Sequence, residues 1–158
     1  MTDSTTGRTL DTTCEAAVTS PDFKERDAVL PRVKRTISTD DAPAAVGAYS
    51  QATTNGDVLI TAGQLPLTTD GELLDEESVA DQTRQCLKNV EAILESEDLS
   101  LDDVLKTTVF LDDIDDFDEF NEAYSEFFQN DPPARSAVEA GAVPKGAAVE
   151  IEAIASTE

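Results

Sequence analysis

Histidine and tryptophan are absent from this 158-residue chain, and only two cysteines, Cys14 and Cys86, are present. The absence of histidine excludes Ser-His-Asp and Cys-His catalysis and any histidine-ligated zinc. Two cysteines far apart in the sequence make neither a disulfide framework nor a four-cysteine metal site. Cys86 falls in a helical pattern, where the role of a small buried hydrophobe is favoured over that of a nucleophile. Proton transfer must therefore depend on carboxylates, lysines, tyrosines or water.

Basic residues are also scarce. The chain has 11 of them against 34 acidic residues, which gives a net charge of −23 and a sequence pI near 4.1. Binding to nucleic acid or to an anionic membrane normally requires a basic patch, so neither partner is expected. We interpret the acidity chiefly as a solvated surface. A salt-rich cytoplasm, as in halophiles, is a setting in which such self-repulsion would be screened.

Long hydrophobic runs and phosphate-binding motifs are missing as well. No apolar stretch reaches the length of a membrane span and the N-terminus lacks a signal-peptide pattern, so we expect a cytoplasmic protein. Neither G-x-x-x-x-G-K-[ST] nor G-x-G-x-x-G occurs, and no internal repeat is visible. With 39% hydrophobic residues, a chain of this length is expected to form one domain without disulfides or metals.

Residues 1–32 differ in composition from the remainder. They are rich in Thr, Ser, Asp and Glu, and their apolar residues keep no sustained period, which predicts a disordered or loosely docked acidic extension. The composition changes near Val33. We therefore expect the compact domain to comprise residues 33–158.

Hydrophobic periodicity predicts the elements of this domain. Strand patterns occupy residues 33–38, 47–53, 58–65, 104–111, 132–139 and 149–155. Helical spacing predicts one helix that begins at Ser78 and a second that begins at Asp116. The fold class is therefore α+β, with two helices covering one face of one mixed sheet. The other face needs cover, which an oligomer with packed sheets would supply.

Short signals refine these elements. Asn55-Gly56 is a strong signal for a two-residue hairpin turn, because both residues tolerate positive φ. Asp81 follows Ser78 by three residues and completes a capping box, and Asp116 with Glu119 gives the start signal of the second helix. Both helix starts are thus marked independently of the hydrophobic pattern.

Two features of the elements leave alternatives open. Gly63 lies late in an apolar strand, where a β-bulge is favoured over a close approach of another backbone or a ligand. The second helix carries an aromatic stripe, for which core packing is favoured over base stacking because interleaved cations are absent. The stripe comprises Phe117, Phe120, Tyr124, Phe127 and Phe128. Asn121 lies between these aromatics and could reach a neighbouring backbone.

The last two strands carry the strongest candidates for chemistry. Arg135 follows Pro132-Pro133 at the head of a short strand, where a guanidinium suits bidentate capture of a carboxylate. The competing interpretation is a structural ion pair with Glu139 or Glu150. In the final strand Glu150 and Glu152 alternate with apolar residues, and either carboxylate could position a water. The Tyr49 hydroxyl could bind a substrate, or its ring could merely pack.

A set of short motifs, in this order from about Val33 to Ala155, resembles the RidA (YjgF/YER057c/UK114) family. Each motif is weak alone, but together they are a specific signal, and residues 1–32 lie outside the resemblance. The motifs are Ala42-Pro43-Ala44-Ala45-Val46-Gly47-Ala48-Tyr49-Ser50-Gln51, Thr61-Ala62-Gly63-Gln64-Leu65-Pro66, Asn89-Val90, Lys106-Thr107-Thr108-Val109-Phe110, Phe120-Asn121, Pro133-Ala134-Arg135-Ser136 and Val149-Glu150-Ile151-Glu152-Ala153-Ile154-Ala155.

The resemblance implies a chorismate-mutase-like α+β subunit in a homotrimer with three clefts at subunit boundaries. It implies hydrolysis of 2-aminoacrylate, or of its tautomer 2-iminopropionate, to a 2-keto acid and ammonia without a cofactor or metal. By motif, Arg135 would grip the substrate carboxylate and Glu150 would orient or activate water. The same motifs imply that the cleft is lined by Tyr49, by the backbone around Gly63 and Ala137, and by Asn121.

The chain departs from the family pattern at two positions. Ala48 stands where the family often has proline before the tyrosine, and Ala137 stands where many of its deaminases have cysteine two residues after the arginine. Backbone contacts survive the second change, whereas a thiol role does not. Two other functions therefore stay in view: a non-catalytic regulatory trimer that binds small carboxylates and, less favoured because of the acidic charge, a ribonuclease.

Overall fold

A mixed sheet is the framework of residues 33–158, which are the part of the chain that the computed structural model describes. The expected N-terminal extension and Cys14 lie outside the described residues. The sheet has six strands in the order β1-β2-β3-β6-β4-β5. β5 runs parallel to β4, and the other neighbouring strands are antiparallel. The strands are β1 (Arg35–Ile37), β2 (Ala52–Thr54), β3 (Val58–Thr61), β4 (Val104–Leu111), β5 (Ala134–Glu139) and β6 (Val149–Ser156).

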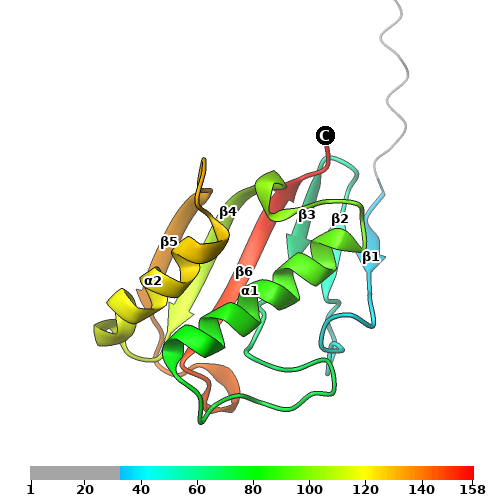
Figure 1. Ribbon diagram of the computed structural model, residues 1–158. Helices are drawn as coiled ribbons and strands as arrows, with labels where there is room; N and C mark the ends of the chain where they lie inside the picture. The colour runs from blue at the N-terminus through cyan, green and yellow to red at the C-terminus, as the bar shows by residue number, and fades with distance from the viewer. Residues whose placement is uncertain (1–32) are drawn as a thin grey trace, which may run out of the picture. The chain divides into compact units, whose positions relative to one another are not determined.

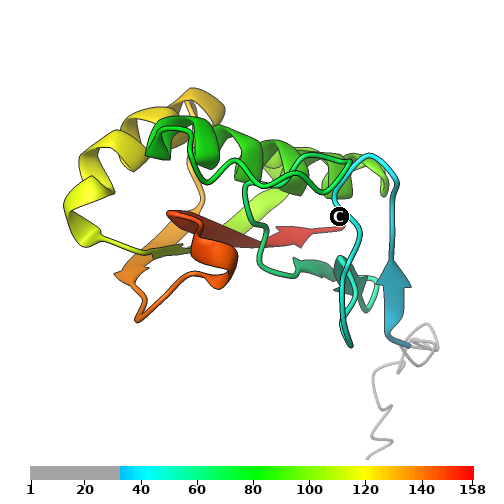
Figure 2. The ribbon, with the colours of Figure 1, turned by 90° about the horizontal axis from the view of Figure 1, so that it is seen from below.

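Both helices lie on the same side of this sheet, and no helix of residues 33–158 covers its other face, which is called the open face below (Figures 1 and 2). They are α1 (Val79–Glu95) and α2 (Phe117–Phe127). Three short 3-10 turns precede β4, α2 and β6: η1 (Leu101–Asp103), η2 (Ile114–Asp116) and η3 (Pro144–Gly146). The α+β class predicted from the sequence is confirmed.

Alternation along β6 separates the two faces. Val149, Ile151, Ala153 and Ala155 are buried on the helix side, whereas Glu150, between them, is half-buried on the open side. Because successive side chains of a strand point to opposite faces, this pattern places the glutamates of β6 away from the core. The open face also carries the exposed Ile60 and Val138 side chains on β3 and β5.

The predicted starts of α1 and α2 are both confirmed, and that of α1 also has a side-chain cap. The Ser78 hydroxyl oxygen accepts a hydrogen bond from the Asp81 backbone N–H at 3.1 Å, as predicted, but the Asp81 carboxylate accepts from the Ser78 hydroxyl and not from its backbone N–H, so the capping box is only half formed. Asp116 is the N-cap of α2 but makes no side-chain cap bond. The predicted start is confirmed, although the Glu119 carboxylate does not cap its own helix and accepts a hydrogen bond from the Ala80 N–H at 3.0 Å. Glu119 thus joins α2 to the start of α1.

β3 ends earlier than the sequence predicts. Its regular pairing stops after Ile60, which faces Ile154, and resumes as a single bridge between Gln64 and Ile151. Between these two pairs, residues 61–63 lie opposite residues 152–153 of β6. Three residues thus face two, and the extra residue forms a β-bulge. The Thr61 hydroxyl accepts the Ala153 N–H at 2.9 Å and bridges the interruption. The bulge expected at Gly63 is confirmed.

The aromatic stripe of α2 packs in the core, as expected. Phe120, Tyr124 and Phe128 are buried, and the rings of Tyr124 and Phe128 lie 4.7 Å apart between centroids. Cys86 on α1 is fully buried, and burial raises the pKa of its thiol well above the usual range. A protonated, inaccessible thiol is a poor nucleophile, so the structural interpretation of Cys86 holds.

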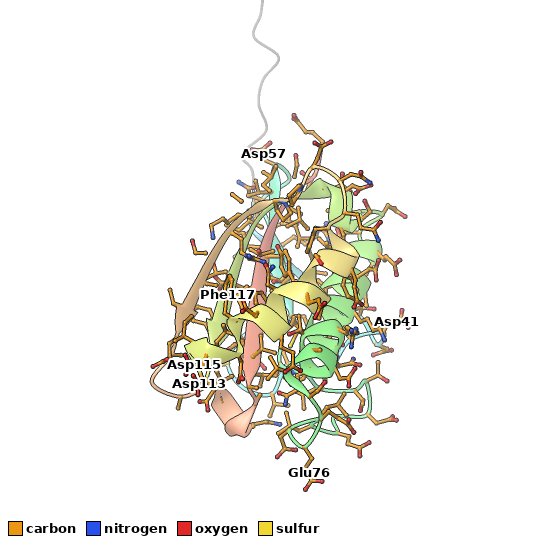
Figure 3. All side chains as sticks on the ribbon, turned by 60° about the vertical axis from the view of Figure 1, so that its left-hand side comes forward. Asp41, Asp57, Glu76, Asp113, Asp115 and Phe117 are labelled. Atoms are coloured by element: carbon orange, nitrogen blue, oxygen red, sulfur yellow. The ribbon has the colours of Figure 1, made fainter. Side chains whose placement is uncertain are left out.

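Acidic side chains lie at both ends of the domain, with Asp57 at one end and Glu76 at the other (Figure 3). In the described part of the chain, two arginines pair with carboxylates: Arg35 with Glu97, and Arg84 with Asp81 and Glu126 at 2.8 and 2.6 Å, which joins the two helices. Within residues 33–158, no helix has the length and apolar character needed to cross a membrane.

Candidate functional site

A cleft of about 490 Å³ opens where the β3 bulge meets the start of β6. It brings together three of the predicted site residues, Tyr49, Gly63 and Glu150. Apolar side chains form most of its walls, so a charged group inside it is poorly hydrated. The remaining lining residues are Ala44, Val46, Ala62, Leu65, Leu67, Pro144 and Lys145. None of these seven was predicted as a site residue, and Leu67, Pro144 and Lys145 also lie outside the quoted motifs, because separate loops supply them.

Glu150 lies directly against Gly63. A Cβ atom at position 63 would come within 2.7 Å of the Glu150 Cδ and 2.9 Å of its Cγ, and closer still to Oε1. The φ of Gly63 is not in the left-handed region, so lack of space, not backbone conformation, requires glycine here. Gly63 is therefore both part of a bulge and a site of close approach, although the approaching group is a side chain.

The Glu150 carboxyl has a pKa raised above its usual value. Burial is the larger cause, and repulsion from the neighbouring Glu152 adds to it. Within residues 33–158, no cation forms an ion pair with Glu150 at salt-bridge distance. A carboxyl of this kind can exchange a proton nearer to neutral pH than an ordinary glutamate can.

Tyr49 projects from the loop that forms one wall of the cleft. Its side chain is 55% exposed, and its hydroxyl oxygen accepts a hydrogen bond from the Val46 N–H at 3.2 Å. This bond uses a lone pair, so the hydroxyl proton is left to donate to a ligand. Gly47, at φ 134°, makes the tight turn that folds the ring back over its own loop.

Arg135 lies in a second, smaller cleft of about 270 Å³ on β5, beneath α2. Its guanidinium carbon is 4.5 Å from the Tyr124 ring centroid, 5.2 Å from that of Phe120 and 5.5 Å from that of Phe117. Such contacts hold a cation without neutralising it. The Nη2 atom donates to the Asn121 Oδ1 at 2.7 Å, which fixes the orientation of the guanidinium plane. We call these three rings the aromatic cradle of Arg135; Phe117, the first residue of α2, is labelled in Figure 3.

The predicted alternative of a structural ion pair for Arg135 is wrong. Glu139 instead accepts the Ile114 backbone N–H at 3.1 Å, and Glu150 lies in the other cleft. Among residues 33–158, Arg135 contacts no carboxylate at ion-pair distance. In a chain of net charge −23, a cation left without a carboxylate partner is a candidate anion site.

The two clefts occupy opposite faces of the sheet. Arg135 pairs with Thr107 of β4, and Thr107 is buried beneath the helices. Glu150 pairs with Phe110, which alternates with the buried Val109 and therefore points to the open face. One chain thus does not bring Arg135 and Glu150 together.

Ala137 belongs with Arg135. It pairs with Val109 on the helix face, two residues further along β5, and packs partly buried against the core. The predicted site residues therefore divide into two groups. Tyr49, Gly63 and Glu150 form one group, and Arg135, Asn121 and Ala137 form the other.

Fold and clefts define a small α+β protein with sites sized for small molecules: one site presents a cation on aromatic rings, the other a carboxyl of raised pKa. The chain belongs to the endoribonuclease L-PSP family, whose model matches residues 39–157 and which is the RidA (YjgF) family identified from the motifs.

Named relatives of this chain are similar over nearly their whole length. A RutC family protein of Pyrococcus horikoshii is 46% identical over 126 residues, which are 80% of this chain and all of the relative. The 2-iminobutanoate/2-iminopropanoate deaminase of Escherichia coli K12 is 45% identical and covers 78% of this chain and 98% of its own. The crystal structure of E. coli TdcF with bound serine superposes with a TM-score of 0.73 at 41% identity, over 77% of this chain and 98% of TdcF.

Proposed function

We propose that this protein hydrolyses reactive 2-enamine and 2-imine carboxylates, of the 2-aminoacrylate and 2-iminopropionate class, to 2-keto acids and ammonia. The observation that carries the proposal is the unpaired guanidinium of Arg135 on its aromatic cradle. Together with the raised pKa of Glu150 it supplies an anchor and a base. The name of the E. coli relative, 45% identical, gives independent support for this chemistry.

The site is completed between subunits of a homotrimer. Two observations support this assembly. Arg135 and Glu150 lie on opposite faces of one sheet, so a substrate held by both needs two chains. The open face of the sheet also leaves Ile60 and Val138 exposed, which is the kind of apolar surface that an oligomer buries.

Hydrolysis needs few catalytic groups, because the imine carbon is already electrophilic. Arg135 binds the substrate carboxylate through two parallel hydrogen bonds, and the Tyr49 hydroxyl donates to the substrate. Glu150 takes a proton from water as the water oxygen bonds to the imine carbon, and it returns that proton to the nitrogen. The hydroxyl of the resulting carbinolamine then passes its proton by way of Glu150 to the amino nitrogen, and the C–N bond breaks as the C=O bond of the keto acid forms, so that the nitrogen leaves as ammonia. 2-Aminoacrylate enters the same sequence after a proton moves from its nitrogen to C3, which gives 2-iminopropionate. Atoms balance with one water consumed and no cofactor.

A second candidate is a non-catalytic trimer that binds small carboxylates. The structure of TdcF with bound serine supports it, because serine is a small molecule that carries a carboxylate. The two functions differ in their need for Glu150, since only catalysis uses its proton transfer. A ribonuclease function is disfavoured by the net charge of −23, because RNA binding depends on basic groups.

The experiment is keto-acid release from 2-aminoacrylate generated enzymatically in the assay. Wild-type protein is expected to accelerate release. Arg135→Ala is expected to lose both turnover and binding of a stable carboxylate, whereas Glu150→Gln should keep binding and lose turnover. Binding without acceleration by the wild type would replace the deaminase with the regulatory candidate. RNA cleavage by nuclease-free wild type that Arg135→Ala loses would instead establish the ribonuclease.

A further inference from the structure

The wall of the Glu150 cleft that carries Tyr49 depends on one buried side chain. Residues 38–50 leave the sheet after β1 and return at β2, and Ala44, Val46 and Tyr49 of this loop line the cleft. A second hollow of about 320 Å³ shares Ala44 and Tyr49 with the cleft, so the loop is hollowed on two sides. Packing alone therefore supports it poorly.

Gln51 supplies the support. Its side chain is only 3% exposed. The Nε2 atom donates to the backbone oxygens of Thr39, Ala42 and Pro43 at 3.0, 3.1 and 2.9 Å, and Oε1 accepts the Thr39 N–H at 2.7 Å. An amide has two N–H groups, so one of them is shared between two carbonyls. Neither a carboxylate nor an apolar group of the same size could make these four contacts.

No other side chain within residues 33–158 replaces this support. Beyond the β1–β2 ladder, the remaining hydrogen bonds of the loop are local: Thr39 with Asp41, and Val46 with Tyr49. Ala42 is buried and anchors the loop by packing. The hydrogen bonds that fix residues 39–43 to the sheet thus all pass through Gln51, eight or more residues away in sequence.

We propose that Gln51 is a positioning residue that holds the Tyr49 loop as the wall of the Glu150 cleft. Its effect on turnover rests on the proposed deaminase function, whereas its effect on the loop does not. When the amide is lost, three carbonyls and one N–H lose their hydrogen-bond partner. The loop then moves toward solvent, because water can replace the lost hydrogen bonds there. The substrate then meets a disordered wall, while Glu150 and its chemistry are unchanged.

Hydrogen–deuterium exchange tests the effect on the loop, with Gln51→Met as the perturbation. The matched control is Thr54→Val, on the strand that Gln51 precedes. Thr54 is also buried. Its hydroxyl donates to the Val58 carbonyl oxygen and accepts from the Gly56 N–H, so it also holds a loop, but at the far end of the hairpin. Exchange of amides 39–50 is expected to rise about tenfold or more in Gln51→Met and to stay at the wild-type rate in Thr54→Val. Equal exchange in the two variants would overturn the proposal.

Kinetics separates positioning from simple destabilisation. A variant that is merely less folded loses active protein, which lowers apparent kcat and leaves KM unchanged. We expect Gln51→Met to raise KM about tenfold, with kcat within about threefold of wild type, because the wall binds substrate and carries no base. A lowered kcat at wild-type KM would contradict the proposal.

Gln51→Glu provides a second variant in case Gln51→Met folds poorly. It keeps an acceptor for the Thr39 N–H but loses both donors, so a loosened loop is again expected. Wild-type exchange and KM in this variant would overturn the proposal. If wild-type protein shows no deaminase activity at all, the proposed function fails, and the exchange comparison still decides the role of Gln51.

Discussion

Replacing Gly63 by alanine adds one methyl group where the structure has no room for it. The new Cβ would lie 2.7 Å from the Glu150 Cδ and 2.9 Å from its Cγ, so the carboxylate must leave its place. Overpacking of this kind costs about 1–3 kcal/mol of stability. A displaced general base costs about 10²- to 10⁴-fold in kcat. Gly63→Ala should therefore lose nearly as much keto-acid release as Glu150→Gln does. Denaturant titration should show that the variant is still folded.

Gly141→Ala is the matched control for this substitution. Nothing lies within 4 Å of a Cβ at position 141, and its φ is not in the left-handed region. Its free energy of unfolding should change by no more than about 1 kcal/mol, in the stabilising direction, with unchanged activity. In a Glu150→Ala background the stability cost of Gly63→Ala should disappear, because the clashing side chain is gone. Wild-type kcat in Gly63→Ala would refute the role of Glu150, and a cost that persists without Glu150 would refute the steric argument.

Three further predictions concern the cation, the base and the surface. Arg135→Lys should raise KM about 10- to 100-fold, because lysine lacks the planar fork that binds carboxylate and Asn121 together, while Arg84→Lys should leave KM unchanged. The value of kcat/KM should fall as the pH drops through the pKa of Glu150, because protonation removes the base, and burial raises this pKa above the ordinary 4.5. A midpoint of the acid side of the pH profile at or below 4.5 would contradict the assignment of Glu150 as the base. The net charge of −23 should make the free energy of unfolding rise between about 0.1 M and 1 M KCl, where the screening length falls from about 10 to 3 Å, and equal stability at both salts would exclude a halophilic adaptation.

Local pattern was sufficient for most of the fold. The period-2 alternation from Val149 to Ala155 predicted β6, and the Ser78 cap with its following apolar stripe predicted α1, because both depend on neighbours in sequence. The prediction fell short where distant parts of the chain decide the outcome. The partner of Glu119 is Ala80, on another helix, and no sequence spacing indicates it.

The candidate site shows the same division. Motif resemblance predicted six site residues, but it could not show that they fall into two groups, because the face of Arg135 depends on the β4–β5 register. The aromatic stripe was predicted only as core. Its second role, contact with the Arg135 guanidinium, requires α2 to lie over β5. The spacing of apolar residues within α2 does not show which strand the helix covers.

Mixing two inactive variants is the most direct test of a site shared between subunits. Arg135→Ala and Glu150→Gln chains, each without turnover alone, are refolded together in equal amounts. In the proposed homotrimer, random mixing gives a boundary an intact Arg135 and an intact Glu150 with probability one half each, so about a quarter of wild-type activity should return. If mixing restores no activity although mixed trimers are recovered, the two residues do not act together across a subunit boundary.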